Sequence, residues 1–414
     1  MIARNTLRHA ASAVSRLLHF SAPADETLSR YFREHRELGQ KERAFVAEAS
    51  FAVLRRLRSL EAAAGSAAPE PLIAAAAMRV LGFSLRALEG LIEPEVAQRI
   101  RLFDSSSLPA AVRVDLPDWL WNRLVDDYGA TEAGRIAEGM LNPAPLDLRV
   151  NLARTRREDV REQLAKDGID AQLTVHSPSA LRIAGKPPIN RHPLFQDGLI
   201  EVQDEGSQLL AWLLAPRRGE MVADYCAGAG GKTLAAAMMM RGTGRIYAMD
   251  VSSKRLASLA VRAARAGVTN VRSIALSGDN DARVKRLSGK LDRVLVDAPC
   301  SGFGTLRRNP DLKWRHGGEA VKQLAKKQTT ILATASRLVK AGGRLVYATC
   351  SVLKEENEAI AEDFAATHPQ FVVLSCDDLL AEQRIALRTG THLRLWPHLH
   401  GTDGFFAAAF QRSG

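Results

Sequence analysis

The sequence has 414 residues, with 57 Lys and Arg against 46 Asp and Glu, which gives a net charge of +11. This length suits two or three domains, and a mix of 46% hydrophobic and 25% charged residues excludes a mainly disordered chain. The longest apolar runs, such as Leu209–Ala215, are too short for a membrane helix, which needs about 18 residues.

The cysteines lie at positions 226, 300, 350 and 376, and no two of them form a C-x-x-C pair. We therefore predict no metal site, and a reducing, cytoplasmic compartment. The arginine-containing stretch 1–24 has no acidic residue and could be a transit peptide, but the helical spacing of Leu7, Ala10, Val14 and Leu17 favours a first helix.

Residues 1 to about 130 are rich in Ala, Leu and Arg, which predicts an all-helical domain. After the Asn142–Pro145 stretch, the pattern predicts a small α+β module. Its expected elements are a strand at Leu146–Asn151, a helix at Arg156–Lys166, and strands at Ala171–His176 and Ala180–Ile183.

From Glu220 onward, strands and helices alternate, which predicts a doubly wound parallel α/β sheet. The expected strands are Met221–Cys226, Arg245–Asp250, Val271–Leu276, Asp292–Asp297, Arg344–Thr349, Phe371–Ser375 and Phe405–Phe410. The expected helices are Thr233–Met240, Ser253–Ala266, Ala320–Val339 and Lys354–Thr367.

The first of these strands runs into a glycine-rich turn, Cys226–Thr233, which is typical of a nucleotide-binding loop. Gly231-Lys232-Thr233 matches the end of a P-loop, although Cys226 stands where the first glycine belongs. Asp297 could then be the magnesium-binding acid of an NTPase, and a P-loop NTPase is the main alternative.

Asp250 favours a different ligand. It ends the second strand, at about the distance from the glycine-rich turn where an acid binds ribose hydroxyls. Asp279 follows the third strand at the same sheet edge, although a helix-capping role explains it equally well. A mononucleoside-like ligand with an adenine end accounts for both acids, and a triphosphate accounts for neither.

Cys300 and Cys350 both follow strand ends, at the edge that already holds the predicted ligand. A single cysteine there is usually a small buried apolar residue. Two thiols at the ends of neighbouring strands, which lie about 5 Å apart, favour a catalytic role for these cysteines. Cys226 and Cys376 retain the structural interpretation.

These motifs resemble those of the Nop/Sun family of RNA cytosine-5 methyltransferases, whose bacterial members are of the RsmB type. The matching segments are Cys226–Thr233, Asp250, Asp297–Gly302, Arg307–Asp311, Tyr347–Ser351, Glu355–Asn357 and Gly401–Phe406. The resemblance covers about 200 to 414, with Phe195–Gln208 similar to the family's entry into its catalytic domain. One departure is Gly228-Ala229, where the family usually has Ala-Pro.

The resemblance implies a class I, Rossmann-like methyltransferase domain at 201–414, an RRM-like α+β module at 140–200 and a NusB-like RNA-binding domain at 1–135. It implies S-adenosylmethionine as cofactor. The residues implied to bind it are Cys226, Ala227, Gly228, Ala229, Gly230, Gly231, Lys232, Asp250, Asp279 and Asp297.

The resemblance also implies that Cys350 attacks carbon 6 of cytosine, that Cys300 assists release, and that Asp297 hydrogen-bonds the base; chemistry alone leaves the two thiol roles open. Lys232 or Arg308 could favour the thiolate. The net positive charge comes entirely from residues 151–414, and its densest segment is Ser301–Thr330. We therefore predict RNA contacts by Arg307, Arg308, Lys313 and Arg315.

We expect a monomer that binds RNA and no membrane, with ribosomal RNA preferred over tRNA as substrate. A second alternative is a non-catalytic RNA-binding protein with an inactive methyltransferase fold, which the intact Asp250, Asp297, Cys300 and Cys350 disfavour. An adenine-N6 methyltransferase is disfavoured because Cys300 stands where that class has an aromatic residue.

Overall fold

The structure is a computed structural model that describes residues 3–88, 92–278 and 281–414. Its contacts divide the chain into two units. One unit comprises Met1–Pro143 and Thr305–Ala320, and the other comprises Ala144–Gly304 and Val321–Gly414. The division into three domains therefore stays a prediction, since the small α+β module shares a unit with the larger sheet.

The first unit is helical, as its alanine-rich and leucine-rich sequence predicts. Its helices are α1 (Arg4–Leu17), α2 (Ala24–Glu34), α3 (Gln40–Arg55), α4 (Leu57–Ala64), α5 (Pro69–Arg79), η1 (Leu85–Leu88), α6 (Pro94–Leu102), α7 (Ala110–Arg113) and α8 (Asp118–Met140). Prolines begin α5 and α6, where a missing N–H costs no helical hydrogen bond. Buried side chains of α1 to α6, such as Val14, Val53 and Leu72, form its core.

The segment Thr305–Ala320 belongs to this helical unit, although it follows Cys300 in sequence. It contains the short helix α15 (Leu312–Arg315). Trp314 packs against the helical core and donates from Nε1 to the Leu54 carbonyl at 2.7 Å. Asp311 accepts from the Ala24 N–H at 3.3 Å. This stretch of the chain is therefore an internal part of the unit and not a solvated loop.

The second unit contains an antiparallel four-stranded sheet in the order β2-β3-β1-β4. Its strands are β1 (Leu146–Val150), β2 (Ala171–Leu173), β3 (Ala180–Ile183) and β4 (Ile200–Val202), with helix α9 (Arg157–Lys166) and the short elements η2 (Ile189–Arg191) and α10 (Pro193–Gln196). Leu148, Val160, Leu164 and Leu181 form its small core. The sequence predicts β1, α9, β2 and β3, but not β4.

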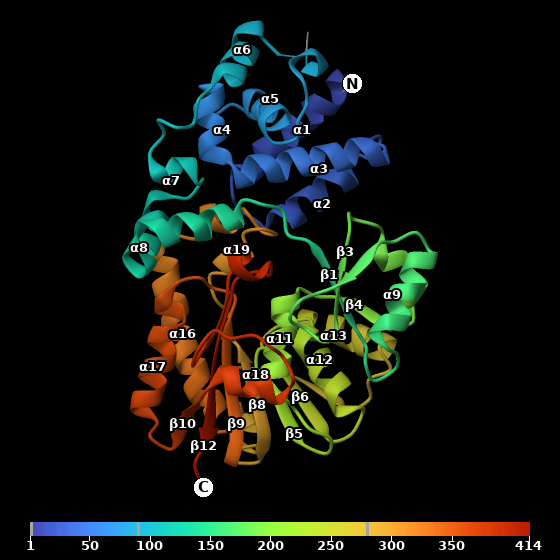
Figure 1. The fold of residues 1–414 in the computed structure, drawn as a ribbon, viewed down its shortest axis with the longest axis vertical. Helices are drawn as coiled ribbons and strands as arrows, with labels where there is room; N and C mark the ends of the chain where they lie inside the picture. The colour runs from blue at the N-terminus through green and yellow to red at the C-terminus, as the bar shows by residue number, and fades with distance from the viewer. Residues whose placement is uncertain (1–2, 89–91, 279–280) are drawn as a thin grey trace. The chain divides into compact units, whose positions relative to one another are not determined.

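The larger sheet has the order β10-β12-β9-β8-β5-β6-β7, with β11 beside β12. Figure 1 labels its strands from β10 to β6. Its strands are β5 (Met221–Asp224), β6 (Arg245–Asp250), β7 (Val271–Ala275), β8 (Leu291–Asp297), β9 (Val339–Thr349), β10 (Phe371–Leu374), β11 (Leu393–Leu395) and β12 (Phe405–Arg412). All pairings among strands β5 to β9 are parallel. Strand β12 instead pairs antiparallel with β9, β10 and β11. The predicted α/β doubly wound fold is confirmed, as a mixed sheet.

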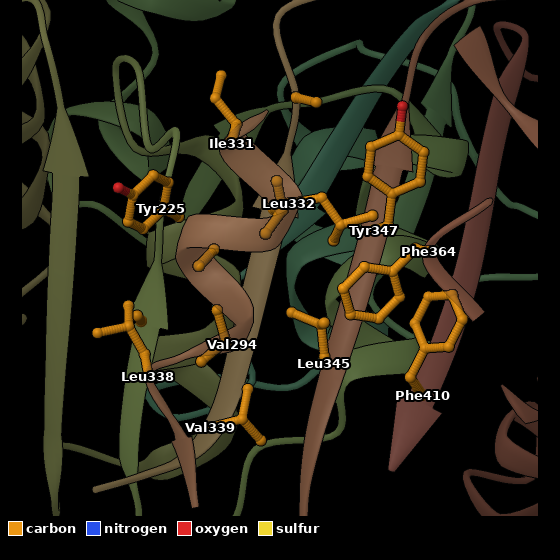
Figure 2. Close-up of a cluster of buried hydrophobic side chains, with 14 of the residues drawn as sticks. Tyr225, Val294, Ile331, Leu332, Leu338, Val339, Leu345, Tyr347, Phe364 and Phe410 are labelled. Carbon is orange, nitrogen blue, oxygen red and sulfur yellow. The ribbon is translucent and has the colours of Figure 1, made fainter. Parts of the chain in front are cut away.

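Alternate residues of the central strands face opposite sides of this sheet, as the strand period of two requires. Val294, Leu345 and Tyr347 face a core that they share with Ile331 and Phe364 (Figure 2). The intervening strand residues face a second core with α11 and α12. Both faces are thus covered, which explains the nearly continuous apolar strands.

The helices that accompany this sheet are α11 (Glu205–Leu214), α12 (Gly231–Met240), α13 (Ser253–Arg265), α14 (Ala282–Lys285), η3 (Phe303–Thr305), α16 (Gly318–Ser336), η4 (Lys354–Glu356), α17 (Glu358–Thr367), α18 (Cys376–Glu382) and α19 (Pro397–His400). Helix α16 ends at Ser336 and β9 begins at Val339, so the predicted helix Ala320–Val339 extends too far and the predicted strand Arg344–Thr349 begins too late. In the described part of the chain, no helix is both long and apolar enough to span a bilayer.

Candidate active site

Two glycines with positive φ shape the loop between β5 and α12. Gly228 has a φ of 54° and Gly230 a φ of 84°. A side chain at Gly230 would overlap Leu259 of α13, so glycine permits this helix to pack against the loop. The Ala227 N–H donates to the Met249 carbonyl at 2.8 Å, which ties the loop to β6. The loop therefore leads from the end of β5 into the N-terminus of α12.

Asp250 braces this loop from the end of β6. Its Oδ2 accepts from the Gly228 N–H at 2.8 Å, and its Oδ1 accepts from the Ser252 N–H at 2.7 Å and from Arg255 Nη2 at 2.9 Å. The side chain is almost fully buried, but it lines the cavity described below. A carboxylate has about four acceptor positions, so Asp250 can accept one further hydrogen bond. The predicted residue Asp279 lies outside the described residues.

A cavity of about 460 Å³ opens at the C-terminal ends of β5, β6 and β8. This size lies within the range of small-molecule sites. The sequence-predicted residues that line it are Cys226, Ala227, Gly228, Ala229, Gly231, Lys232, Asp250, Asp297, Cys300 and Cys350. The prediction that these strand ends share one crevice thus matches the geometry, whereas Gly230 is turned toward α13.

Lys232 and Asp297 form a half-buried ion pair on the wall of the cavity. Lys232 Nζ lies 2.7 Å from Asp297 Oδ2. Burial alone would lower the pKa of Lys232, but Asp297, Cys350 and Asp224 together hold that pKa above its ordinary value. Lys232 therefore carries a stable positive charge beside Cys350.

The Cys300 and Cys350 sulfur atoms lie 3.3 Å apart and are not joined in a disulfide. The hydrogen bond with Cys350, burial, and the charges of Cys350 and Glu356 raise the pKa of the Cys300 thiol well above its ordinary value. Burial, reinforced by three carboxylates, also raises the pKa of Cys226. Cys376 is fully buried in the core, and burial raises its pKa to about 12.

The predicted RNA-binding residues separate into two groups. Lys313 and Arg307 are buried, and Lys313 Nζ donates to the Arg55 carbonyl at 2.8 Å. Burial lowers the pKa of Lys313 to about 7. Arg308 and Arg315 are half-buried, and Arg315 pairs with Asp311 at 3.4 Å. A buried side chain is poorly placed for a contact to RNA phosphate, so Lys313 and Arg307 are the weaker members of this set, and the RNA-binding assignment as a whole stays a prediction.

The sequence predicted no role for several residues around the cavity. Arg149 of β1 donates to the Gly231 carbonyl at 2.6 Å, and Arg262 of α13 donates to the Ala229 carbonyl at 2.7 Å. The small sheet thus helps to hold the glycine-rich loop. Arg255 and the exposed Lys327 also line the cavity. Only Lys327 carried a sequence signal, because it lies in the basic segment.

Comparisons with known proteins identify the family. A family model described as 16S rRNA methyltransferase RsmB/F matches residues 211–411, and a second, for an RsmF/B-like ferredoxin-like domain, matches residues 116–190. A probable ribosomal RNA small subunit methyltransferase B of Bacillus subtilis is 32% identical over 332 residues, which cover 79% of this chain and 74% of the relative. The chain belongs to the RsmB/F methyltransferase family.

Two further comparisons agree with this RsmB/F relationship. A 28S rRNA (cytosine-C(5))-methyltransferase of Mus musculus is 32% identical over 308 residues, which cover 71% of this chain and 38% of the relative. The structure of a methyltransferase homologue from Pyrococcus horikoshii is 29% identical, with a TM-score of 0.63 over 75% of this chain and 100% of the other.

As an RsmB/F enzyme, the chain is an RNA methyltransferase, and its cofactor is S-adenosylmethionine. The cavity suits this cofactor because it combines a buried carboxylate, a helix N-terminus and apolar side chains such as Leu276. The alternative of a P-loop NTPase is wrong. Lys232 is paired with Asp297, the residue which that alternative made a magnesium ligand.

Proposed function

We propose that the chain methylates carbon 5 of cytosine in ribosomal RNA through a covalent bond between Cys350 and the base. The observation that supports this most is the pair of thiols, 3.3 Å apart, on the wall of the cofactor cavity. Carbon 5 of cytosine is a poor nucleophile, and a thiolate that adds to carbon 6 turns it into a reactive enamine carbon. Such chemistry needs a soft nucleophile and a base held out of its stack.

In this proposal the glycine-rich loop and Asp250 hold S-adenosylmethionine, which supplies the methyl group. Asp250 accepts a hydrogen bond from the ribose, and the backbone of Cys226–Lys232 surrounds the remainder. Asp279 is proposed as a further contact. Gly278, its neighbour in sequence, lines the cavity.

Cys350 is the nucleophile in the first step. Its thiolate forms a bond to carbon 6, and protonation or hydrogen bonding at ring nitrogen 3 takes up the displaced electron pair. Asp297 is proposed to hydrogen-bond the base there. Lys232, whose positive charge lies beside Cys350, stabilises the thiolate before attack. Carbon 5 would then take the methyl group that S-adenosylmethionine supplies, with S-adenosylhomocysteine as the by-product.

Cys300 acts after methyl transfer. The main cause of its raised pKa is the hydrogen bond with Cys350. Once the Cys350 sulfur is bonded to carbon 6, it no longer shares that proton, and Cys300 can ionise more easily. Cys300 gives its own proton to water in the open cavity, and its thiolate then removes the proton from carbon 5, so that the bond between Cys350 and carbon 6 breaks and the carbon 5–carbon 6 double bond returns.

RNA binding is assigned to the helical residues 1–135 and to basic groups that are at least partly exposed. Arg308 and Arg315 remain proposed contacts to phosphate, and Lys327 joins them because it is exposed at the cavity. The names of the Bacillus and mouse relatives favour ribosomal RNA as substrate. Sequencing of bisulfite-treated RNA from a deletion strain would show ribosomal RNA or tRNA as the modified class.

Serine variants of the two thiols test the mechanism. Cys350→Ser should abolish methylation and form no covalent complex, because a serine hydroxyl cannot add to carbon 6. Cys300→Ser should still attack and transfer the methyl group, and a nuclease-sensitive complex with RNA should accumulate on a denaturing gel. An adduct with Cys350→Ser and none with Cys300→Ser would exchange the two roles. Intact methylation in both variants would refute the thiol mechanism.

A further inference from the structure

A buried glutamate lies behind the two cysteines. Glu356 is fully buried at the end of η4, and its backbone carbonyl accepts from the Tyr347 hydroxyl at 2.6 Å. Its Oε1 accepts from the Ser301 N–H at 2.8 Å and from Gln328 Nε2 at 2.9 Å. Its Oε2 accepts from the hydroxyls of Ser301 and Ser351, each at 2.5 Å. The carboxylate therefore receives four hydrogen bonds.

The two serines that bond to Glu356 each follow one of the two cysteines. Ser301 comes directly after Cys300, at the end of β8, and Ser351 comes directly after Cys350, at the end of β9. A single carboxylate thus fixes both thiol-bearing loops at once. Asn357 adds a second hold on one of them, since its Nδ2 donates to the Ser351 carbonyl at 3.1 Å.

A structural role alone does not require a negative charge at this position. The donors to Glu356 are an amide, a backbone N–H and two hydroxyls, and among the described residues no Lys or Arg pairs with it. An anion buried without a cation is costly unless its hydrogen bonds are complete. A neutral amide side chain could occupy the same space at lower cost.

We propose that Glu356 is a positioning residue of the methylation reaction, whose carboxylate clamps the two thiol-bearing loops so that the Cys300 and Cys350 sulfurs share one proton. This proposal rests on the proposed function. The proposal explains why the residue is a glutamate, because a fixed carboxylate near Cys300 disfavours a second negative charge on the Cys300 sulfur. The shared proton then stays on Cys300, which leaves the Cys350 sulfur free to attack the base.

The groups that face Cys300 agree with this assignment. Cys350, which directly follows β9, and Glu356 of η4 both raise the pKa of the Cys300 thiol. Tyr347 lies close by, and burial, with the charges of Cys300 and Glu356, raises the pKa of its hydroxyl. Lys232, the nearby cation, acts on Cys350. The arrangement is therefore asymmetric, with the anion behind one thiol and the cation beside the other.

Two variants separate the charge of Glu356 from its hydrogen bonds. In Glu356→Gln, the amide oxygen can still accept from Ser301 N and Gln328, and the amide NH2 can donate to the two serine hydroxyls, which also accept. The geometry is kept and the charge is lost. Glu356→Ala removes both. Glu362→Gln, on the exposed face of α17, is the matched control for a lost charge.

The test uses the full-length enzyme and three measurements. Isothermal titration gives S-adenosylmethionine affinity, single-turnover assays with substrate RNA give the methyl-transfer rate and the covalent adduct, and peptide-resolved alkylation against pH titrates Cys300 and Cys350 separately. We expect Glu356→Ala to slow methyl transfer about 100-fold at unchanged KM for RNA, because a displacement of about 1 Å costs this much. Glu356→Gln should retain most of the rate but titrate Cys300 at lower pH.

Cofactor affinity should be unchanged in all three variants. A Glu356→Ala enzyme that transfers methyl groups within threefold of the wild-type rate would overturn the clamp. If Glu356→Ala does not fold, Glu356→Gln decides, and an unchanged Cys300 titration in that variant would overturn the proposal. The alkylation profile needs no RNA. It therefore tests Glu356 even if the wild-type enzyme forms no adduct and the proposed function fails.

Discussion

Replacement of Asp250 by alanine tests the proposed cofactor site most directly. The carboxylate accepts hydrogen bonds from Gly228, Ser252 and Arg255. In the proposed function it accepts one more, from a ribose hydroxyl of the cofactor. A hydrogen bond to a charged group contributes about 1.5–3 kcal/mol, and about 1.4 kcal/mol changes an equilibrium constant tenfold. We expect Asp250→Ala to weaken S-adenosylmethionine binding about 10- to 150-fold.

Isothermal titration with S-adenosylmethionine measures this loss, and the affinity for RNA should hardly change. Asp377 of α18 provides a matched control. Its Oδ1 accepts from the Thr389 N–H at 2.7 Å and from the Gly390 N–H at 3.0 Å, and none of these residues lines the cofactor cavity. Asp377→Ala should lower thermal stability but leave cofactor affinity intact. If Asp250→Ala binds the cofactor within twofold of wild type, the ribose assignment is wrong.

Two other predictions concern the basic residues. Replacement of Arg308 or Lys327 by alanine should weaken RNA binding and leave cofactor affinity unchanged. The slope of log K for RNA against log salt should fall by about one for each phosphate that the protein no longer neutralises. An unaltered slope would show that the residue does not bind phosphate. Because burial lowers the pKa of Lys313 from 10.5 to about 7, the unfolded chain binds one more proton than the folded chain between these values, and stability should rise with pH there. The free energy of unfolding should rise by at most about 1.4 kcal/mol per pH unit. Thermal unfolding between pH 7 and 9 should show this rise in the wild type but not in Lys313→Met. An equal rise in both proteins would contradict the buried-lysine interpretation.

The sequence indicated the catalytic half well because buried parallel strands carry a strong local signal. Strand β6 has the predicted bounds, Arg245–Asp250, and β8 differs by one residue. Parallel strands end at one edge of a sheet, so the sequence alone was enough to place Asp250, Asp297 and the two cysteines together. The antiparallel pairing of β12 was not predictable from its apolar pattern, since a strand buried on both faces looks the same in either direction.

The basic segment after Cys300 shows where local pattern fails. Charged residues in sequence suggest a solvated surface, and Lys313 and Arg307 are counted there with Arg308 and Arg315. The interior position of Lys313 depends on the Arg55 carbonyl and on Asp115, which lie far from it in sequence. A propensity for exposure is an average over contexts, and a partner distant in the chain can reverse it.

The same limit applies to Glu356, whose motif is visible in the sequence while its role is not. Spacing within Tyr347–Asn357 reveals that a glutamate follows Cys350 by six residues, which is compatible with an exposed helix start. Its partners are Ser301, in the loop after β8, and Gln328 of α16, and only the fold brings them within 2.8 and 2.9 Å. The two Cys-Ser pairs look like independent strand ends in sequence. In the structure they share one acceptor, so a change at either serine should disturb both thiols, and the position of the nucleophile cannot be separated from that of its neighbour.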